Sequence, residues 1–195
     1  GAAAGRKSAV KLLNWYRRQT VRRKIFIPFF AITLFSSTIF TIYGFFQNTL
    51  AIERGIDKRL LIAAYTMPKL LPADYFDRVQ NPTSITPDEH WSNTRRLEFF
   101  LNKVGGTYLY ALLKESNRYY FVASAATDTA YWVEYTNPAP NIYEVQKTWA
   151  PNVSTTPDPD YGLLRSVVVG YKDSAGRRFI LGADINASEV AALKR

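Results

Sequence analysis

The longest apolar segment of the chain runs from Ile25 to Phe46 and contains no charged residue. At 1.5 Å per residue, a helix over this segment would be about 33 Å long, which is enough to cross a hydrocarbon layer of about 30 Å. Pro28 falls in the first turn, where a missing backbone N–H is tolerated. The pattern therefore predicts a transmembrane helix over 25–46.

A cleavable signal peptide is the alternative interpretation of this segment. The apolar part of a signal peptide is usually about 7–15 residues long and is followed by a site of small residues. The segment here is longer, and residues 47–50 (Gln-Asn-Thr-Leu) offer no such site. We therefore expect the helix to remain in the protein as an anchor.

Apolar residues continue at helical spacing beyond the predicted span, and they end where Pro68 and Pro72 follow. The spacing of three or four positions places them on one face of a helix. They are Ile52, Ile56, Leu60, Ala63 and Met67. We expect a single helix to extend outward to about residue 67, with its later residues packed on the domain and its earlier ones in a dimer seam.

A further helix is predicted to begin at Thr86, because Thr86-Pro87-Asp88-Glu89 combines a capping box with proline at the first helical position. It would end at Gly105-Gly106, since glycine commonly terminates helices. Two strands are then predicted over 107–114 and 118–125, joined by the turn residues Glu115-Ser116-Asn117.

Residues 126–160 are rich in Pro, Asn, Thr and Asp, and only 142–149 carries a helical pattern. So long a connection inside a compact domain is usually functional. Two apolar strands within 165–185 follow, and a last helix is predicted over 188–194. Strands and helices do not alternate as a doubly wound sheet requires, so the predicted fold class is α+β with an antiparallel sheet.

The net charge of +9 is concentrated at the N-terminus. Residues 1–24 contain eight basic residues and no acid, and the rest of the chain is nearly neutral. Excess basic residues mark the cytoplasmic flank of a membrane helix, so we expect 1–24 in the cytoplasm and 47–195 outside it. The same distribution removes the basic-patch argument for nucleic-acid binding by the folded part.

The residue types offer little support for catalysis. The chain has no cysteine, which excludes thiol catalysis and Cys-based zinc sites. The single histidine, His90, follows two acids in a predicted first helical turn, where we expect a solvated surface residue. Asp158-Pro-Asp160 could bind a cation, but two carboxylates in a Pro-rich turn are usually turn formers. We therefore predict no enzyme activity, cofactor or metal for the outer domain.

Two stretches carry a resemblance to a known family: IDKRLLIAAYTMPKLLPADYFDRV (56–79) and LLRSVVVGYKDSAGRRFILGADI (163–185). With the Y-x-Y and F-V-A-S strands between them, they resemble the extracytoplasmic PAS-like Cache (PDC) sensor domain of bacterial histidine kinases, diguanylate cyclases and chemoreceptors. The resemblance covers roughly 47–190. It implies a ligand site between the sheet and the long connection, with the outer helix on the other face.

The resemblance also implies signalling through the membrane helix to an output domain in a longer chain. Amino-acid-binding members of the family carry a Tyr-x-x-x-x-Arg-x-Trp signature, which this sequence lacks. Their Asp in a G-x-D strand contacts the ligand amine, and Gly182-Ala183-Asp184 is similar to that element alone.

Arg165 and Asp184 are the strongest candidates for a site, because each places a charge in an otherwise apolar strand. Such a charge is costly unless it is paired or serves a ligand. If Tyr171 pairs with Arg178 across the turn, the two charges lie opposite each other, with Gly182 leaving room above the sheet. Arg165 would bind an anion, and Asp184 a ligand amine or Arg165 itself. A structural cross-strand ion pair is the alternative.

Aromatic and hydroxyl residues would complete the pocket, since ligand sites combine apolar walls with a few placed polar groups. Tyr131 and Trp132 begin the long connection, and Tyr110 and Ser124 lie on the predicted strands. We predict a receptor in the cytoplasmic membrane, forming a homodimer, whose periplasmic or extracellular domain senses a small anionic or zwitterionic ligand. A non-sensing structural or protein-interaction module of the same fold is the alternative.

Overall fold

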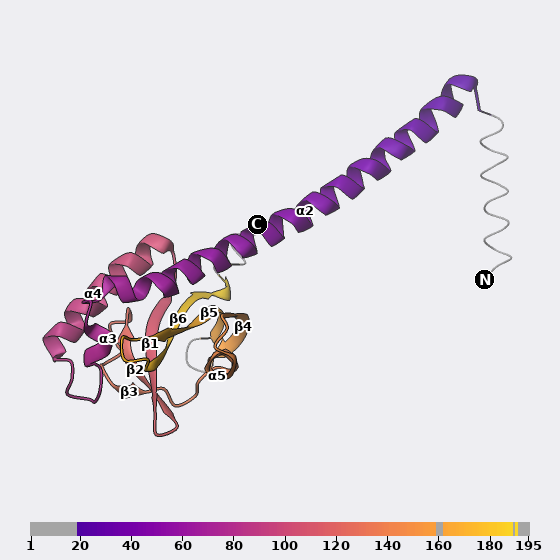
Figure 1. Cartoon of the computed structure of the whole chain (residues 1–195). Helices are drawn as coiled ribbons and strands as arrows, with labels where there is room; N and C mark the ends of the chain where they lie inside the picture. The colour runs from indigo at the N-terminus through magenta and orange to yellow at the C-terminus, as the bar shows by residue number, and fades with distance from the viewer. Residues whose placement is uncertain (1–18, 159–161, 189, 191–195) are drawn as a thin grey trace. The chain divides into compact units, whose positions relative to one another are not determined.

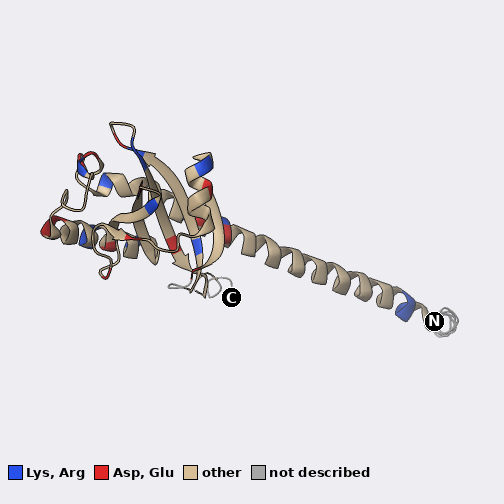
Figure 2. Ribbon diagram, turned by 90° about the horizontal axis from the view of Figure 1, so that it is seen from below, with Lys and Arg blue, Asp and Glu red and all other residues tan. Residues whose placement is uncertain are grey.

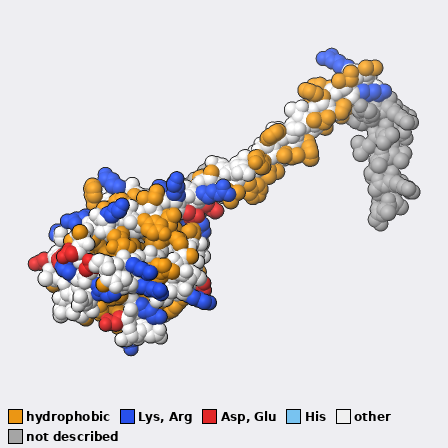
Figure 3. Space-filling view, in the orientation of Figure 1, with side chains coloured by type: hydrophobic (Ala, Val, Ile, Leu, Met, Phe, Trp, Pro, Cys, Tyr) orange, Lys and Arg blue, Asp and Glu red, His pale blue; other side chains and the backbone are white. Residues whose placement is uncertain are grey.

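The computed structural model describes residues 19–158, 162–188 and 190, and the chain divides into two units between Thr49 and Leu50. Helix α2 (Val21–Leu70) begins in the first unit. Most of its large apolar side chains before residue 50 are exposed, and Figure 3 shows such side chains along the helix. Charged residues are absent from α2 between Lys24 and Glu53 (Figure 2). Among the described residues, α2 is the one helix long and apolar enough to span a membrane.

The second unit is built on one antiparallel sheet of six strands in the order β3-β2-β1-β6-β5-β4 (Figure 1). The fold is α+β and PAS-like, as the sequence predicts. The strands are β1 (Tyr108–Glu115), β2 (Arg118–Ser124), β3 (Val133–Glu134), β4 (Asn152–Asp158), β5 (Gly162–Lys172) and β6 (Arg178–Asn186). The remaining helices are α3 (Tyr75–Arg78), α4 (Pro87–Val104) and α5 (Pro140–Thr148).

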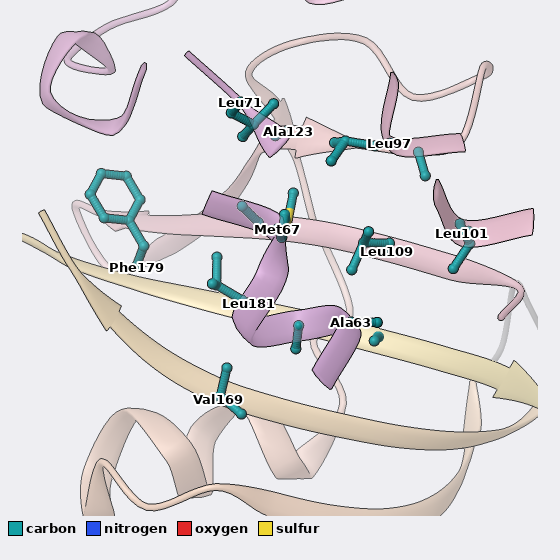
Figure 4. Packing of buried hydrophobic residues seen from close by; sticks show 14 of the residues in the cluster. Ala63, Met67, Leu71, Leu97, Leu101, Leu109, Ala123, Val169, Phe179 and Leu181 are labelled. Carbon is teal, nitrogen blue, oxygen red and sulfur yellow. The ribbon is translucent and has the colours of Figure 1, made fainter. Parts of the chain in front are cut away.

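The principal core lies between one face of the sheet and helices α2, α3 and α4. Figure 4 shows Met67 of α2 and Leu97 of α4 in the same cluster as Leu109, Phe179 and Leu181 of the sheet. The later residues of the predicted helical stripe are all buried here, which confirms that they pack on the domain: Ile56, Leu60, Ala63 and Met67. The dimer seam expected for the earlier residues stays a prediction.

A smaller apolar cluster lies on the opposite face, which α5 covers. Ile142 and Val145 of α5 pack against Leu112, Val168 and Ile180 of the sheet. We call the two sides of the sheet the α2 face and the α5 face. Because side chains alternate along a strand, each strand contributes to both.

Local signals in the sequence account for most element boundaries. Thr86 caps α4 by accepting a hydrogen bond from the backbone N–H of Glu89 at 3.3 Å, and Gly105 ends the helix with φ of 67°. Ser116 and Asn117 both have positive φ, which gives the two-residue turn between β1 and β2 a backbone twist that suits a hairpin.

The register of β5 and β6 differs by one residue from the prediction. Tyr171 pairs with Phe179, so Arg165 lies opposite Ile185 and Asp184 lies opposite Ser166. A shift of one residue moves every side chain of a strand to the other face. Arg165 therefore lies on the α2 face and Asp184 on the α5 face.

The turn explains this register. Gly176 donates its N–H to the carbonyl of Asp173, and Arg177 donates its N–H to the Asp173 carboxylate at 2.7 Å. Gly176 adopts φ of 79°. This is a three-residue turn with a left-handed residue at its end, closed by Asp173 and Arg177.

The long connection over 126–160 also differs from the prediction, because it contains strands β3 and β4 besides α5. Strand β4 is the edge strand beside β5, and it alternates between partly buried and exposed residues. Its sequence, Asn152–Asp158, is short and polar and includes Pro157, as an edge strand tolerates. The helix predicted over 188–194 lies mostly outside the described residues, as does most of 1–24.

Candidate functional site: a buried acidic pocket on the α5 face

A small pocket lies on the α5 face, over β1, β2 and β6. Tyr108 and Tyr110 are two residues apart on β1 and share this face, and Tyr108 pairs with Asp184 of β6. The residues that line the pocket are Tyr108, Tyr110, Phe121, Ser124, Ala126, Thr129, Tyr135 and Asp184. We call it the Asp184 pocket.

An irregularity in the sheet brings two residues of β2 to the pocket. Phe121 and Ser124 are three residues apart, a spacing that would place them on opposite faces of a regular strand. The β1–β2 register shifts between Ala111 and Leu112, where β2 carries one extra residue. A bulge of this kind turns the side chains that follow it, so both residues face the pocket.

Asp184 is the chemically distinctive group of the pocket. Its side chain is 4% exposed, and its Oδ1 atom has no hydrogen-bond partner. The pKa of this carboxyl is raised to about 7, mainly by burial and also by the nearby Asp158, while hydrogen bonds from Ser166 and Tyr110 oppose the shift. No lysine or arginine is among the described residues that line the pocket.

Asp158 contributes a second negative group beside the pocket, although the sequence predicts it only as a turn former. It ends β4, is 7% exposed, and accepts a hydrogen bond from the Tyr135 hydroxyl at 2.8 Å. Burial and the carboxylate of Asp158 raise the pKa of Tyr135. Tyr135 therefore stays protonated and donates its hydrogen bond to Asp158. It provides no positive charge to balance Asp184.

The pocket is small because Tyr110 occupies much of the space above Gly182. Its cavity has a volume of about 20 Å³, roughly what one water molecule or one ammonium group needs. Tyr110 pairs with Gly182 across the strands, and its ring lies where a Cβ of residue 182 would stand. A larger ligand could enter only if the Tyr110 ring moved.

We expect Gly182→Ala to lose about 1–3 kcal/mol of unfolding free energy, because the new methyl group overlaps the Tyr110 ring. Chemical denaturation measures the loss. Gly55→Ala is the matched control, since a Cβ at residue 55 meets no atom within 4 Å and alanine is favoured in a helix by about 0.5–1 kcal/mol. Equal stability of the Gly182 variant and the parent would contradict the position of the ring.

Arg165 is not part of the Asp184 pocket. On the α2 face its guanidinium makes a two-point ion pair with Asp57 of α2, Nε to Oδ1 at 2.8 Å and Nη2 to Oδ2 at 2.7 Å. Its Nη1 also donates to Thr155 of β4 at 3.0 Å. The predicted pairing of Arg165 with Asp184 is therefore wrong.

Tyr131 and Trp132 also lie away from Asp184, and both pack against the α2-face core. Tyr131 lines a separate groove with Ile85 and Trp91, and its hydroxyl donates to the carbonyl of Asn81 at 3.0 Å. Trp132 stacks on Tyr120, with ring centroids 5.5 Å apart.

The prediction of a solvated His90 is wrong as well. The residue is 3% exposed, and its Nε2 lies 3.0 Å from the carbonyl of Thr129. Burial lowers the pKa of its imidazole. The described residues contain no group of three or more metal-binding side chains.

Three of the predicted residues, Asp184, Tyr110 and Ser124, line the pocket, and Gly182 lies beneath the Tyr110 ring. Sequence reasoning missed Tyr108, Phe121, Tyr135 and Asp158 as neighbours of Asp184. The spacing of Tyr108 and Tyr110 could have indicated a shared face. The positions of Phe121 and Tyr135 depend on the bulge and on the path of the connection, for which the sequence carries no comparable signal.

No protein-family model and no curated protein sequence matches the chain. Solved structures that resemble it are sensory domains of the Campylobacter jejuni chemoreceptor Tlp3. The complex with L-valine has a TM-score of 0.42 and 16% sequence identity, over 86% of this chain and 67% of that one. The sensory domain with isoleucine bound has a TM-score of 0.40 and 14% identity, over 86% and 66%.

A third solved structure, the Tlp3 domain in complex with L-norvaline, has a TM-score of 0.42 and 15% identity over 83% of this chain and 59% of that one. The chain thus spans about two thirds of the length of these structures. The chain is similar to chemoreceptor sensory domains, which is the class of protein that the sequence resemblance names.

Proposed function

We propose that the outer unit is a sensor domain whose Asp184 pocket binds the positively charged amine of a small molecule. The observation that carries this proposal is the buried Oδ1 of Asp184, which has no hydrogen-bond partner although it faces a cavity. A buried polar atom without a partner is costly, and a ligand that donates a hydrogen bond to it removes that cost.

The surroundings of Asp184 favour a cation over an anion. Asp158 adds negative charge, and the rings of Tyr108, Tyr110 and Phe121 surround the cavity. Aromatic faces attract cations, and more strongly where water is excluded. The expectation of an anionic ligand depended on Arg165, which lies on the opposite face of the sheet. A zwitterion would bind through its amine.

We further propose the arrangement in the membrane that the sequence predicts: residues 1–24 in the cytoplasm, 25–46 across the cytoplasmic membrane, and the sensor domain in the periplasm or outside the cell. Helix α2 contains both the apolar segment and the residues that pack on the sheet. Occupancy of the pocket would act on the membrane segment through this helix, in a homodimer.

Thermal unfolding of the full chain tests the ligand class. At pH 8, where Asp184 is ionised, we expect methylammonium and simple amino acids to raise the melting temperature and acetate to leave it unchanged. A ligand at 100 times its Kd contributes about 2.7 kcal/mol, which corresponds to a shift of roughly 5–10 °C in a domain of this size.

Asp184→Asn should abolish the stabilisation by methylammonium, and Asp77→Asn, on the other side of the sheet, should retain it. Stabilisation by acetate alone, or full stabilisation of the Asp184 variant, would contradict the proposed ligand class. If no small molecule changes the melting temperature, the non-sensing module is the better description.

A further inference from the structure

The ion pair between Arg165 and Asp57 joins β5 to α2. Asp57 lies in the part of α2 that follows the apolar segment. Both side chains are about three-quarters buried, with exposed fractions of 24% and 23%. The guanidinium contacts both carboxylate oxygens, a geometry that only arginine provides. Arg165 therefore fixes the position of one particular turn of α2 against the sheet.

A second carboxylate lies one helical turn away. Glu53 precedes Asp57 by four residues, so the two acids share a face of α2 and lie about 6 Å apart along its axis. A cavity of about 120 Å³ is lined by both acids together with Arg165 and Thr155. The guanidinium therefore has room to move from Asp57 toward Glu53, and that residue already acts electrostatically on it.

The residue next to Arg165 contacts Asp184. Ser166 pairs with Asp184 across the strands, and its side chain is hydrogen-bonded to the Asp184 carboxylate. Consecutive side chains of β5 thus contact the pocket on one face and α2 on the other. A displacement of β5 at Ser166 displaces the backbone of Arg165 as well.

We propose that Arg165 is a latch with two positions, which holds Asp57 in this structure and Glu53 in a second state, and that the charge of Asp184 selects between them. This inference rests on the proposed function in one respect, because binding of an amine is what would neutralise Asp184. Two discrete arrangements of similar energy are what a switching element needs, since a ligand shifts an equilibrium only through its differential affinity.

The second position is tested by a double-mutant cycle on the full chain in lipid nanodiscs. We expect Asp57→Asn to lower the melting temperature by a few degrees and Glu53→Gln to lower it by less, because Arg165 contacts Asp57 in this structure. The double variant should lose more than the sum of the two, because Glu53 otherwise replaces the lost partner. Additive losses would overturn the second position.

Arg165→Lys keeps the charge but cannot make the two-point pair, so it should resemble Asp57→Asn. Equal stability of Arg165→Lys and the parent would show that the two-point geometry is not needed, and would overturn the latch.

The link to the pocket is tested by combining Asp184→Asn with Asp57→Asn. These residues lie on opposite faces and share no contact, so independent sites would give additive effects. We expect the folding equilibrium constant of the double variant to differ about fivefold from the value that additive effects would give. The control cycle combines Asp184→Asn with Glu89→Gln, which breaks the ion pair of Arg78 and Glu89 between α3 and α4 and should be additive.

Additivity of the Asp184–Asp57 cycle would overturn the link. The outcome is separate from the proposed ligand class. If methylammonium binds while the cycle is additive, the pocket stands and the latch fails. If the cycle is non-additive and no amine binds, the latch stands and the ligand class is wrong.

Discussion

The free energy of unfolding of the second unit, residues 50–195, should fall between about pH 4 and pH 7 because of Asp184. The folded state holds a proton on this carboxyl up to a pKa of about 7, whereas the unfolded chain releases it near 3.8. Between these values the folded state binds more protons, so its stability decreases as the pH rises. A difference of this size corresponds to roughly 4 kcal/mol.

Denaturant titrations across this pH range measure the effect. Asp184→Asn should remove the decline, so that the variant matches the parent near pH 4 and exceeds its stability above pH 7. Asp77→Asn is the control, because Asp77 has the opposite effect on the pH dependence of stability. Hydrogen bonds from Ser174 lower the pKa of Asp77. Its stabilisation is present above the unfolded pKa and lost as the pH falls. Parallel curves for the Asp184 variant and the parent would contradict the assignment.

Phe179→Ala should reduce the unfolding free energy by about 3–5 kcal/mol, the range for deleting a buried aromatic side chain. Phe179 is fully buried on the α2 face, where its ring contacts Phe76 of α3 at 4.9 Å between centroids and also contacts Tyr171. The substitution leaves a cavity between the sheet and α3 that the rigid strands cannot close.

Thermal unfolding should show a decrease of about 10 °C or more for the Phe179 variant. Arg178→Ala, at the adjacent position, is the control. Arg178 is exposed and lies over the Trp149 ring on the other face, so its loss should cost about 1 kcal/mol or less. Comparable losses for the two variants would contradict the assigned faces of β6.

The side chains of β6 illustrate how much of this fold the sequence predicts. Within one strand the period of two is local, so Asp184 and Gly182 share one face as the sequence predicts, and Phe179 and Leu181 lie on the other. The relation between β5 and β6 depends on the turn, and a turn one residue longer than assumed places Arg165 on the opposite face. The sequence D-x-x-G carried the information, because glycine in a left-handed conformation implies a three-residue turn.

The pocket was only partly predictable for a different reason. Asp184 could be identified because a charge in an apolar strand is costly, which is a property of the residue and its neighbours in sequence. Tyr135 and Asp158 reach it from the long connection, where no periodic pattern indicates direction. The same reasoning identifies Arg165 as a candidate site residue. Its partner is Asp57 of α2, and no pattern in the sequence indicates that Asp57 faces the sheet.

The strand order has a consequence for biosynthesis. The middle of the sheet is formed by β1 and β6, which are the first and the last of the described strands along the chain. Until β6 has emerged, the β1–β2 and β4–β5 pairs each present an unpaired apolar edge, the kind of surface that aggregates. Pairing between segments so distant in sequence is also slow. A chain interrupted before Arg178 therefore yields two open half-sheets, whose apolar edges are covered only when β6 is made.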